Sequence, residues 1–251
     1  MCGIVEMKRS AAVDKAKKNE IYLSKKAGKA LFDYKMIDDG DKISVGVSGG
    51  KDSMSLLKIL DFRRSFVPIK YDLVAIHIDM YDTKKQAQSL KRYFEDNGYE
   101  YKMIKLRLAG SDESRNCFWC SWNRRKALFE EANKLGIKKI ALAHHLDDIA
   151  ESILMNMFYN GEISSMLPKQ VLFKGAITLI RPFAYAQESE IVRYAVNLKV
   201  PFFKCLCRHA DTNKRELMQK IIRLLSKDCH EVRTNIFRSL TRIKKEYLLN
   251  P

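Results

Sequence analysis

The sequence predicts an α/β fold in which a doubly wound sheet of five parallel strands is covered by helices on both faces. Short apolar segments alternate with longer segments whose apolar residues recur at helical spacing, which is the pattern of repeated strand–helix–strand units. One apolar segment, residues 71–79, is almost uninterrupted, as expected of a strand buried on both faces. A glycine-rich loop follows the first strand, and ligands of such folds bind beyond the carboxyl ends of the strands.

The predicted elements alternate through the middle of the chain. Strands are expected at residues 43–47, 71–79, 101–106, 139–143 and 176–180. Helices are expected between them at residues 53–64, 83–97, 117–135 and 147–159. Residues 161–175 read as an extended crossover over the edge of the sheet. Right-handed crossovers then bring the ends of all the strands to one side of the sheet.

Helical segments without strands flank this alternation. Residues 7–38 are rich in Lys and predict an amphipathic helix or a pair of helices. Further helices are expected at residues 188–198, 212–225 and 231–249. We therefore expect three parts, a basic N-terminal helical segment at residues 1–40, an α/β domain at 41–185 and a C-terminal helical region at 186–251.

The chain of 251 residues is strongly basic, with a formal net charge of +16 from 46 Lys and Arg against 30 Asp and Glu. Such an excess favours a polyanionic partner, because each phosphate that is neutralised releases counterions. A generally basic protein without such a partner is the alternative. The sequence has neither an apolar run as long as a membrane span nor a signal-peptide pattern, so we expect a cytoplasmic protein with no membrane partner.

The most informative motif is Ser48-Gly-Gly-Lys-Asp-Ser53, which directly follows the first predicted strand. Its glycines let the backbone approach a ligand closely, and the helix that begins there offers unpaired N–H groups and a positive dipole end, as in phosphate-binding loops. A Walker A loop would instead require Gly at Val45 and Ser or Thr at Asp52. The motif resembles the PP-loop of the N-type ATP pyrophosphatases, which split ATP between the α and β phosphates. A glycine-rich turn in an unrelated protein is the alternative.

The cysteines form a second group of candidate residues. The six are Cys2, Cys117, Cys120, Cys205, Cys207 and Cys229. In a chain that we expect in the cytoplasm, they indicate metal or sulfur chemistry more than disulfides. The Cys117-x-x-Cys120 and Cys205-x-Cys207 pairs could together hold structural zinc, or three of the four could hold an iron–sulfur cluster with one open iron. A redox pair and two unrelated pairs of buried cysteines are the other interpretations.

A third candidate group follows the fourth predicted strand, where His144, His145, Asp147 and Asp148 lie just beyond its end. A carboxylate beside ATP phosphates can hold Mg²⁺, which neutralises charge on the leaving pyrophosphate. The structural alternatives are a helix N-cap for Asp147 and a buried, hydrogen-bonded imidazole for either histidine.

Together and in this order, these motifs resemble the tRNA 2-thiocytidine synthetases of the PP-loop ATP pyrophosphatase superfamily, whose fold is PP-loop or HUP-like. The matching segments are the glycine motif at Ser48, the cysteine pair at Cys117 followed by Arg124-Arg125, Ala-Leu-Ala-His-His-Leu-Asp-Asp from Ala141, Leu154-Met-Asn-Met-Phe-Tyr159, Met166-Leu-Pro-Lys169, Ile180-Arg-Pro182 and the cysteine pair after Pro201. The likeness runs from about Ala30 to Leu240. The loop before Cys117 is shorter here, and a long acidic tail is absent.

The resemblance implies an ATP-dependent thiolation of cytidine in a tRNA anticodon loop, at a position-32 type of site. The enzyme would adenylate O2 of the base, so that sulfide could displace AMP. In that family a [4Fe–4S] cluster on three cysteines carries the sulfur. The ligands would be Cys117, Cys120 and one of Cys205 and Cys207. Because this chain has Cys-x-Cys where Cys-x-x-Cys is usual, the third ligand depends on the alignment, and we choose Cys207.

The resemblance also implies where ATP binds. It assigns nucleotide binding to Ser48, Gly49, Gly50, Lys51, Asp52, Ser53, His77, Ala143 and His144. It assigns the catalytic roles to Lys51, Asp52, Arg124 and Asp148. Lys51 and the glycine N–H groups would stabilise the charge that develops on pyrophosphate, with Mg²⁺ as a further cofactor. Ala143 stands where the family usually has Gly, which narrows the adenine or ribose wall by one methyl group.

The expected partners are tRNA and a sulfur donor, either a cysteine desulfurase persulfide or sulfide. The target base must leave its stack to reach the site. The candidates for contacts to the RNA backbone are Lys15, Lys17, Lys18, Lys25 and Lys26 of the first helix and Lys214, Arg215, Arg233, Arg238 and Arg242 near the end of the chain. A solvated helix face is the alternative for each of them. A homodimer is left open as the assembly.

Two other functions compete with this interpretation. A tRNA 2-thiouridine synthetase would use the same chemistry, but those enzymes carry additional zinc-binding cysteines at both ends, where this chain has no Cys-x-x-Cys. A zinc-stabilised RNA-binding protein with a degenerate nucleotide site would use the same cysteines without the reaction. Lysidine synthetases share the glycine motif but do not need the cysteine set.

Overall fold

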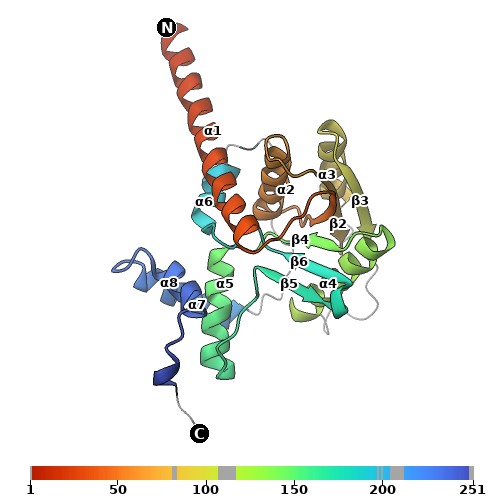
Figure 1. Cartoon of the computed structure of the whole chain (residues 1–251). Helices are drawn as coiled ribbons and strands as arrows, with labels where there is room; N and C mark the ends of the chain where they lie inside the picture. Colours follow the sequence, from red (N-terminus) through yellow and green to blue (C-terminus); the bar gives the residue numbers. More distant parts are fainter. Residues whose placement is uncertain are drawn as a thin grey trace.

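The computed structural model describes residues 2–80, 84–106, 117–196, 198, 200–203 and 212–248. Within these residues the strands are β1 (Asp41–Gly46), β2 (Tyr71–Asp79), β3 (Glu100–Lys105), β4 (Lys139–Ala141), β5 (Lys169–Leu172) and β6 (Ile177–Ile180). They form a sheet of six described strands in the order β3-β2-β1-β4-β6-β5 (Figure 1). The five strands that the sequence predicts are parallel to one another, which confirms the predicted fold class.

The sixth strand, β5, was not predicted, because its residues were expected to form an extended crossover. It pairs antiparallel with β6 at the edge of the sheet, with Lys169 opposite Ile180 and Leu172 opposite Ile177. A tight turn that includes Lys174 at φ +53 and Gly175 at φ +97 connects the two strands. A four-residue edge strand that begins with two polar residues carries too little apolar pattern to be recognised in the sequence.

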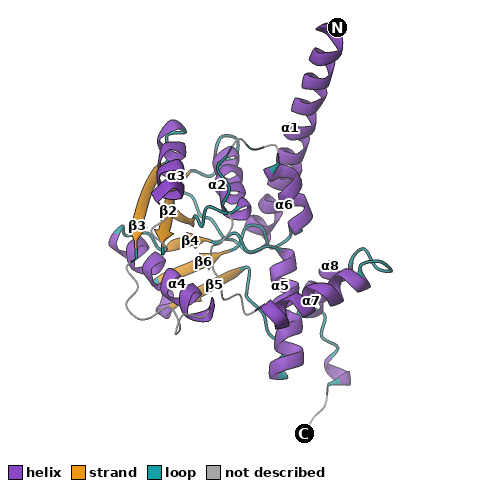
Figure 2. Cartoon of the chain, turned by 180° about the vertical axis from the view of Figure 1, so that it is seen from behind, coloured by secondary structure: helices purple, strands orange, loops and turns teal. Residues whose placement is uncertain are grey.

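The described helices are α1 (Cys2–Asp33), α2 (Lys51–Arg64), α3 (Lys84–Asp96), α4 (Cys117–Lys134), α5 (Leu146–Met155), α6 (Glu188–Ala195), α7 (Thr212–Leu225) and α8 (Val232–Ser239). Short helical turns occur at η2 (Asn156–Asn160), η3 (Phe173–Gly175) and η4 (Lys245–Tyr247). Figures 1 and 2 show α1, α2, α3 and α6 on one side of the sheet and α4 on the other. None of the described helices combines the length and the apolar character that a membrane crossing requires.

Strand β2 shows why both faces of the sheet are covered. Leu73 and Ala75 belong to the buried cluster that also contains the apolar side chains of α1, α2, α3 and α6. Val74 and Ile76 point the other way, into a cluster with Leu128 of α4. Because successive side chains of a strand face opposite sides, the uninterrupted apolar run at residues 73–76 requires helices on both faces.

The last helices lie against α5 beside the sheet (Figure 1). A third buried cluster joins Ala150 and Leu154 of α5 to Met218 of α7 and Val232 of α8. The bounds of α7 agree with the prediction, whereas the single helix expected at residues 231–249 is wrong beyond Ser239. There the hydroxyl groups of Ser239 and Thr241 donate to the carbonyl oxygens of Ile236 and Arg238, and such local bonds compete with a continuing helix.

Helix α1 is a single long helix, one of the two arrangements that the sequence allowed. Leu23, Ala27 and Ala30 on its second half are fully buried in the core. Its first half extends beyond the rest of the molecule in both views (Figures 1 and 2). The helix is therefore held to the α/β core at one end only.

Candidate active site

The loop between β1 and α2 contains the glycine motif and is held in shape by its own serines. The backbone N–H of Ser48 donates to Ser53 Oγ at 3.1 Å, and Ser53 Oγ donates to the Gly50 carbonyl at 3.1 Å. Gly49 has φ +82, a conformation that a residue with a side chain rarely adopts, and an added Cβ would lie 3.2 Å from a ring carbon of Phe203. Gly50 caps α2, so the first N–H groups of the helix are directed at the space in front of the loop.

A cavity of about 470 Å³ lies in front of this loop, at the carboxyl ends of β1 and β4. Its polar wall residues come from the glycine motif (Ser48, Asp52, Ser53), α4 (Ser121, Arg124, Arg125), the segment from β4 into α5 (His144, His145, Asp148, Glu151), and the helices α6 and α7 (Glu188, Arg215, Gln219), with Ala143 among the apolar ones. Seven of the predicted site residues, from three separate parts of the sequence, therefore lie around one space. They are Ser48, Asp52, Ser53, Arg124, Ala143, His144 and Asp148.

His77 has a different position from the one that nucleotide binding suggests. Its ring is buried at 6% exposure on β2, and its Nδ1 lies 2.8 Å from the carbonyl oxygen of Val47, so that it supports the end of β1 from beneath the loop. Burial lowers the pKa of His77, which keeps the ring neutral near pH 7. This histidine does not belong to the described cavity wall.

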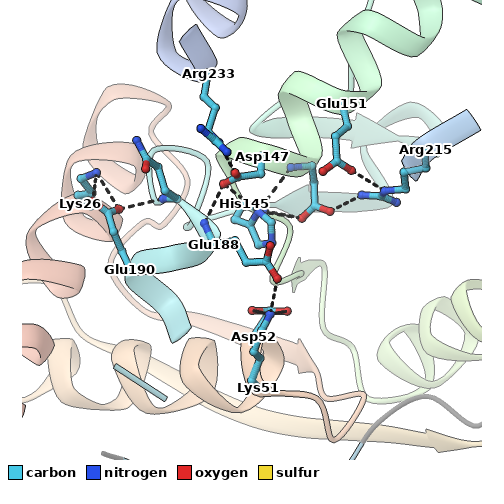
Figure 3. A network of polar contacts seen from close by, with 12 residues as sticks. Lys26, Lys51, Asp52, His145, Asp147, Glu151, Glu188, Glu190, Arg215 and Arg233 are labelled. Carbon is cyan, nitrogen blue, oxygen red and sulfur yellow. Dashed lines mark hydrogen bonds and ion pairs between the residues drawn. The ribbon is translucent and has the colours of Figure 1, made fainter. Parts of the chain in front are cut away.

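Lys51, the cation of the glycine motif, forms ion pairs with two carboxylates (Figure 3). Its Nζ lies 2.8 Å from Asp52 Oδ1 and 2.9 Å from Glu188 Oε1. Burial alone would lower the pKa of Lys51, but the bonds to the two carboxylates raise it above the ordinary value. The hydrogen bond from Lys51 lowers the pKa of Glu188 in turn. Glu188 was not among the predicted site residues, because it lies 137 residues from Lys51 in the sequence.

The start of α5 carries a cluster of carboxylates that two arginines of the C-terminal helices neutralise (Figure 3). Arg215 of α7 contacts Asp148 and donates from Nε to Glu151 Oε2 at 2.6 Å. Arg233 of α8 contacts Asp147 through its Nε. Both arginines were expected to bind the RNA backbone, but their side chains are directed at this cluster instead.

The histidine and aspartates after β4 have structural roles that the sequence left open. His145, not Asp147, is the N-cap of α5, and it forms a capping box in which its own N–H donates to Asp148 Oδ2 at 2.9 Å. Asp147 accepts the backbone N–H of Glu188 at 2.7 Å, which joins the start of α6 to the start of α5. Among the side chains that the structure describes, no three His, Cys, Asp or Glu residues are grouped in a way that could hold a metal ion.

Two polar atoms near the cavity are buried and have no hydrogen-bond partner among the described residues, namely Arg124 Nε and His144 Nδ1. Burial lowers the pKa of His144 to about 4, so the ring is neutral at pH 7 and its Nδ1 either donates or accepts one hydrogen bond, depending on the tautomer. Buried polar atoms are normally satisfied, and an unsatisfied pair at a cavity wall is consistent with a ligand that supplies the missing partners.

The described part of the cysteine set lies on a helix, α4, that borders the same cavity. Cys120 is buried at 8% exposure on α4, and Ser121 beside it lines the cavity. The side chain of Cys117, and Cys205 and Cys207, lie outside the described residues. On the two sides of the second pair, the N–H of Phe203 donates to the Gly49 carbonyl at 2.9 Å, and Arg215 of α7 contacts Asp148. The chain therefore contacts the glycine loop before this pair and the cavity wall after it.

Comparison with known proteins adds three findings. The PP-loop domain family matches residues 20–224. The chain is 34% identical over 239 residues to a tRNA-cytidine(32) 2-sulfurtransferase of Syntrophotalea carbinolica, a match that covers 91% of each chain. It is 35% identical over 232 residues to the protein of that name from Geobacter sulfurreducens, covering 89% of this chain and 90% of the relative.

A solved structure has a similar fold. It is the U34-tRNA thiolase NcsA from Methanococcus maripaludis with its [4Fe-4S] cluster, with a TM-score of 0.73 and 21% sequence identity over 91% of this chain and 81% of that chain. At this level of identity the likeness concerns the fold.

Proposed function

Because the chain belongs to the PP-loop domain family, and within it to the family of the tRNA-cytidine(32) 2-sulfurtransferases, we propose that it uses ATP to replace O2 of a cytidine in a tRNA anticodon loop with sulfur. The observation that carries this proposal is that the glycine loop and the Cys120 helix border one cavity. Ser48 and Asp52 line it from the loop, and Ser121 and Arg124 line it from α4. An activated base would then lie within reach of both a departing phosphate and a sulfur-carrying centre.

The first step transfers AMP to the base. The base carbonyl oxygen attacks the α-phosphorus of ATP, the bond to the β-phosphate breaks, and pyrophosphate leaves. The N–H groups at the start of α2 and the cation of Lys51 stabilise the charge that appears on pyrophosphate. Arg124 faces the same cavity and adds a second positive charge. Oxygen ligands suit Mg²⁺, and Asp52 and Asp148, which both line the cavity, are the carboxylates that would hold it beside the phosphates.

The second step replaces the adenylated oxygen. A sulfur nucleophile attacks C2 of the base, and AMP leaves with the original oxygen, so that C2 exchanges one bond to oxygen for one bond to sulfur. Thiolates suit iron, and Cys120, buried on the helix that borders the cavity, belongs to the ligand set that we propose, Cys117, Cys120 and Cys207. A [4Fe–4S] cluster bound there would supply the sulfur. His144, neutral and with an unsatisfied Nδ1, is placed to hydrogen-bond the base or the nucleotide.

We further propose that the enzyme works in the cytoplasm, where tRNA and a persulfide or sulfide donor are available. The net charge of +16 supports a polyanionic substrate. The exposed lysines of α1 remain candidates for backbone contacts, except Lys26, whose Nζ lies 2.6 Å from Glu190.

The experiment that tests this function is nucleoside analysis of tRNA by mass spectrometry, in cells with the gene, without it, and with an Asp52→Ala variant. We expect 2-thiocytidine to be present with the gene and absent in both other strains. Loss of 2-thiouridine with normal 2-thiocytidine would contradict the assignment of the base, and unchanged thionucleosides in all strains would overturn the proposed function.

A further inference from the structure

The π-helical turn η2, which continues α5, exposes three apolar side chains in succession. Met157 is 44% exposed, Phe158 is 59% exposed and Tyr159 is 42% exposed. Successive residues of a helical turn point in different directions around its axis. Exposure of all three therefore means that this end of the helix stands away from its neighbours, and in Figures 1 and 2 the end of α5 extends away from the sheet.

The segment is held firmly although it is exposed. The side-chain amide of Asn156 donates to the carbonyl oxygen of Ser164 at 3.0 Å and bonds its hydroxyl at 2.9 Å. Gly161 ends the turn in the left-handed conformation, at φ +65. The aromatic side chains therefore form a preorganised surface, defined here as the Phe158–Tyr159 platform.

A cation joins the platform to the active site. Lys214 of α7 lies with its Nζ 4.6 Å from the centroid of the Tyr159 ring. The next residue, Arg215, contacts Asp148 at the cavity wall. Asp148 and Tyr159 are about 15 Å apart along the axis of α5 and η2. That separation is one that a few nucleotides of an unpaired RNA loop can span.

On the basis of the proposed function, we propose that the Phe158–Tyr159 platform stacks an unpaired base of the tRNA loop while the neighbouring target base enters the cavity. Aromatic faces bind bases of any sequence, and a cation beside the ring strengthens the interaction and contacts the phosphate backbone. Recognition of RNA hairpins relies on such unpaired, splayed bases. An exposed aromatic surface that carries a lysine, on a protein of net charge +16, complements RNA better than it complements a lipid or an apolar protein surface.

The test compares binding to an anticodon stem–loop with binding to the same stem closed as a blunt duplex. We expect Tyr159→Ala to weaken stem–loop binding about five- to a hundredfold, and to leave the weaker duplex binding and the affinity for ATP unchanged. Tyr159→Phe keeps the aromatic face and should bind as the wild type does. Phe66→Ala is the matched control, because Phe66 is also exposed, at 57%, and carries Arg63 at 5.7 Å from its ring, but lies beyond the end of α2 opposite the glycine loop.

Lys214→Ala provides a second measurement. It should reduce the slope of log affinity against log salt for the stem–loop by about one, because one phosphate contact is lost. Unchanged stem–loop affinity in both Tyr159→Ala and Phe158→Ala would overturn the platform. The platform would also be overturned if the wild type sedimented as a dimer and Tyr159→Ala as a monomer, because the surface would then bind a second copy of the chain.

The two proposals can fail separately. If the wild type prefers the stem–loop to the duplex and the platform variants do so equally, the platform is refuted and the proposed function stands. If the wild type itself shows no preference and the tRNA of the deletion strain keeps its 2-thiocytidine, both are refuted.

Discussion

Arg215 is the residue whose removal tests the described wall of the active site most directly. Its Nε lies 2.6 Å from the carboxylate of Glu151, whose side chain is 6% exposed. Replacement by Met keeps an apolar stem but leaves that carboxylate buried without its cation. A hydrogen bond to a charged group contributes about 1.5–3 kcal/mol, and the 47% exposure of Arg215 favours the lower part of this range. We expect Arg215→Met to lower the free energy of unfolding by about 2 kcal/mol near pH ~7.5.

The size of this effect must depend on pH, because a buried carboxylate can take up a proton instead of remaining charged. Glutamate has an ordinary pKa of 4.5, and protonation above that pH costs about 1.4 kcal/mol per pH unit. The loss of stability that a charged Glu151 can cause in the Arg215→Met variant is therefore limited to about 1.4 kcal/mol near pH ~5.5 and to about 4 kcal/mol near pH ~7.5. Burial already raises the pKa of Glu151 against the attraction of Arg215. Loss of Arg215 raises it further, so the variant loses stability as the pH increases from 4.5.

Urea unfolding followed by circular dichroism at the two pH values measures this difference. The control is Arg215→Met in a Glu151→Gln background, where the charge of Glu151 is absent and only the less buried carboxylate of Asp148 loses its cation, so that most of the pH dependence should disappear. A loss of stability that is equal at both pH values, or that persists unchanged in the Glu151→Gln background, would refute the account of this ion pair.

Three further predictions concern the cavity. Glu188→Gln should release Lys51 and tighten ATP binding by up to about fivefold, as expected for a half-exposed ion pair. Weaker ATP binding of this variant in calorimetry would show that Glu188 itself contacts the ligand. Gly49→Ala should weaken ATP binding at least about tenfold and lower the free energy of unfolding by about 1–2 kcal/mol, because Gly49 has a positive φ and an added Cβ would contact Phe203. Wild-type values in both measurements would contradict the loop geometry. Cys120→Ala should abolish the broad absorption near ~400 nm of anaerobically purified protein while ATP binding persists, and a retained iron spectrum would remove Cys120 from the ligand set.

The fold and the location of the candidate site could be predicted from local patterns. Glycines that directly follow an apolar strand indicate a phosphate-binding loop without knowledge of the tertiary structure. The parallel sheet follows from the alternation of strands and helices. The bounds of α7 are equally local, because its apolar residues repeat at helical spacing. These features depend on residues that are close together in the sequence.

The ion-pair network could not be predicted in this way. Arg215 and Asp148 are 67 residues apart, and Arg233 and Asp147 are 86 residues apart, so their meeting depends on how α7 and α8 pack on α5. In the sequence these arginines look like any other basic residues on a solvated helix. A basic residue on a solvated helix face and an arginine that neutralises a buried carboxylate look alike in the sequence, because only their tertiary contacts differ.

One backbone hydrogen bond links the glycine loop to the far end of the chain. The Gly49 carbonyl accepts from the N–H of Phe203, about 150 residues further along. The geometry of the glycine loop therefore depends on a contact that closes a loop of about 150 residues, and closing such a loop has an entropic cost. A fragment that ended at residue 185 would retain the whole glycine motif, but it would lack Phe203 and therefore the hydrogen bond to the Gly49 carbonyl.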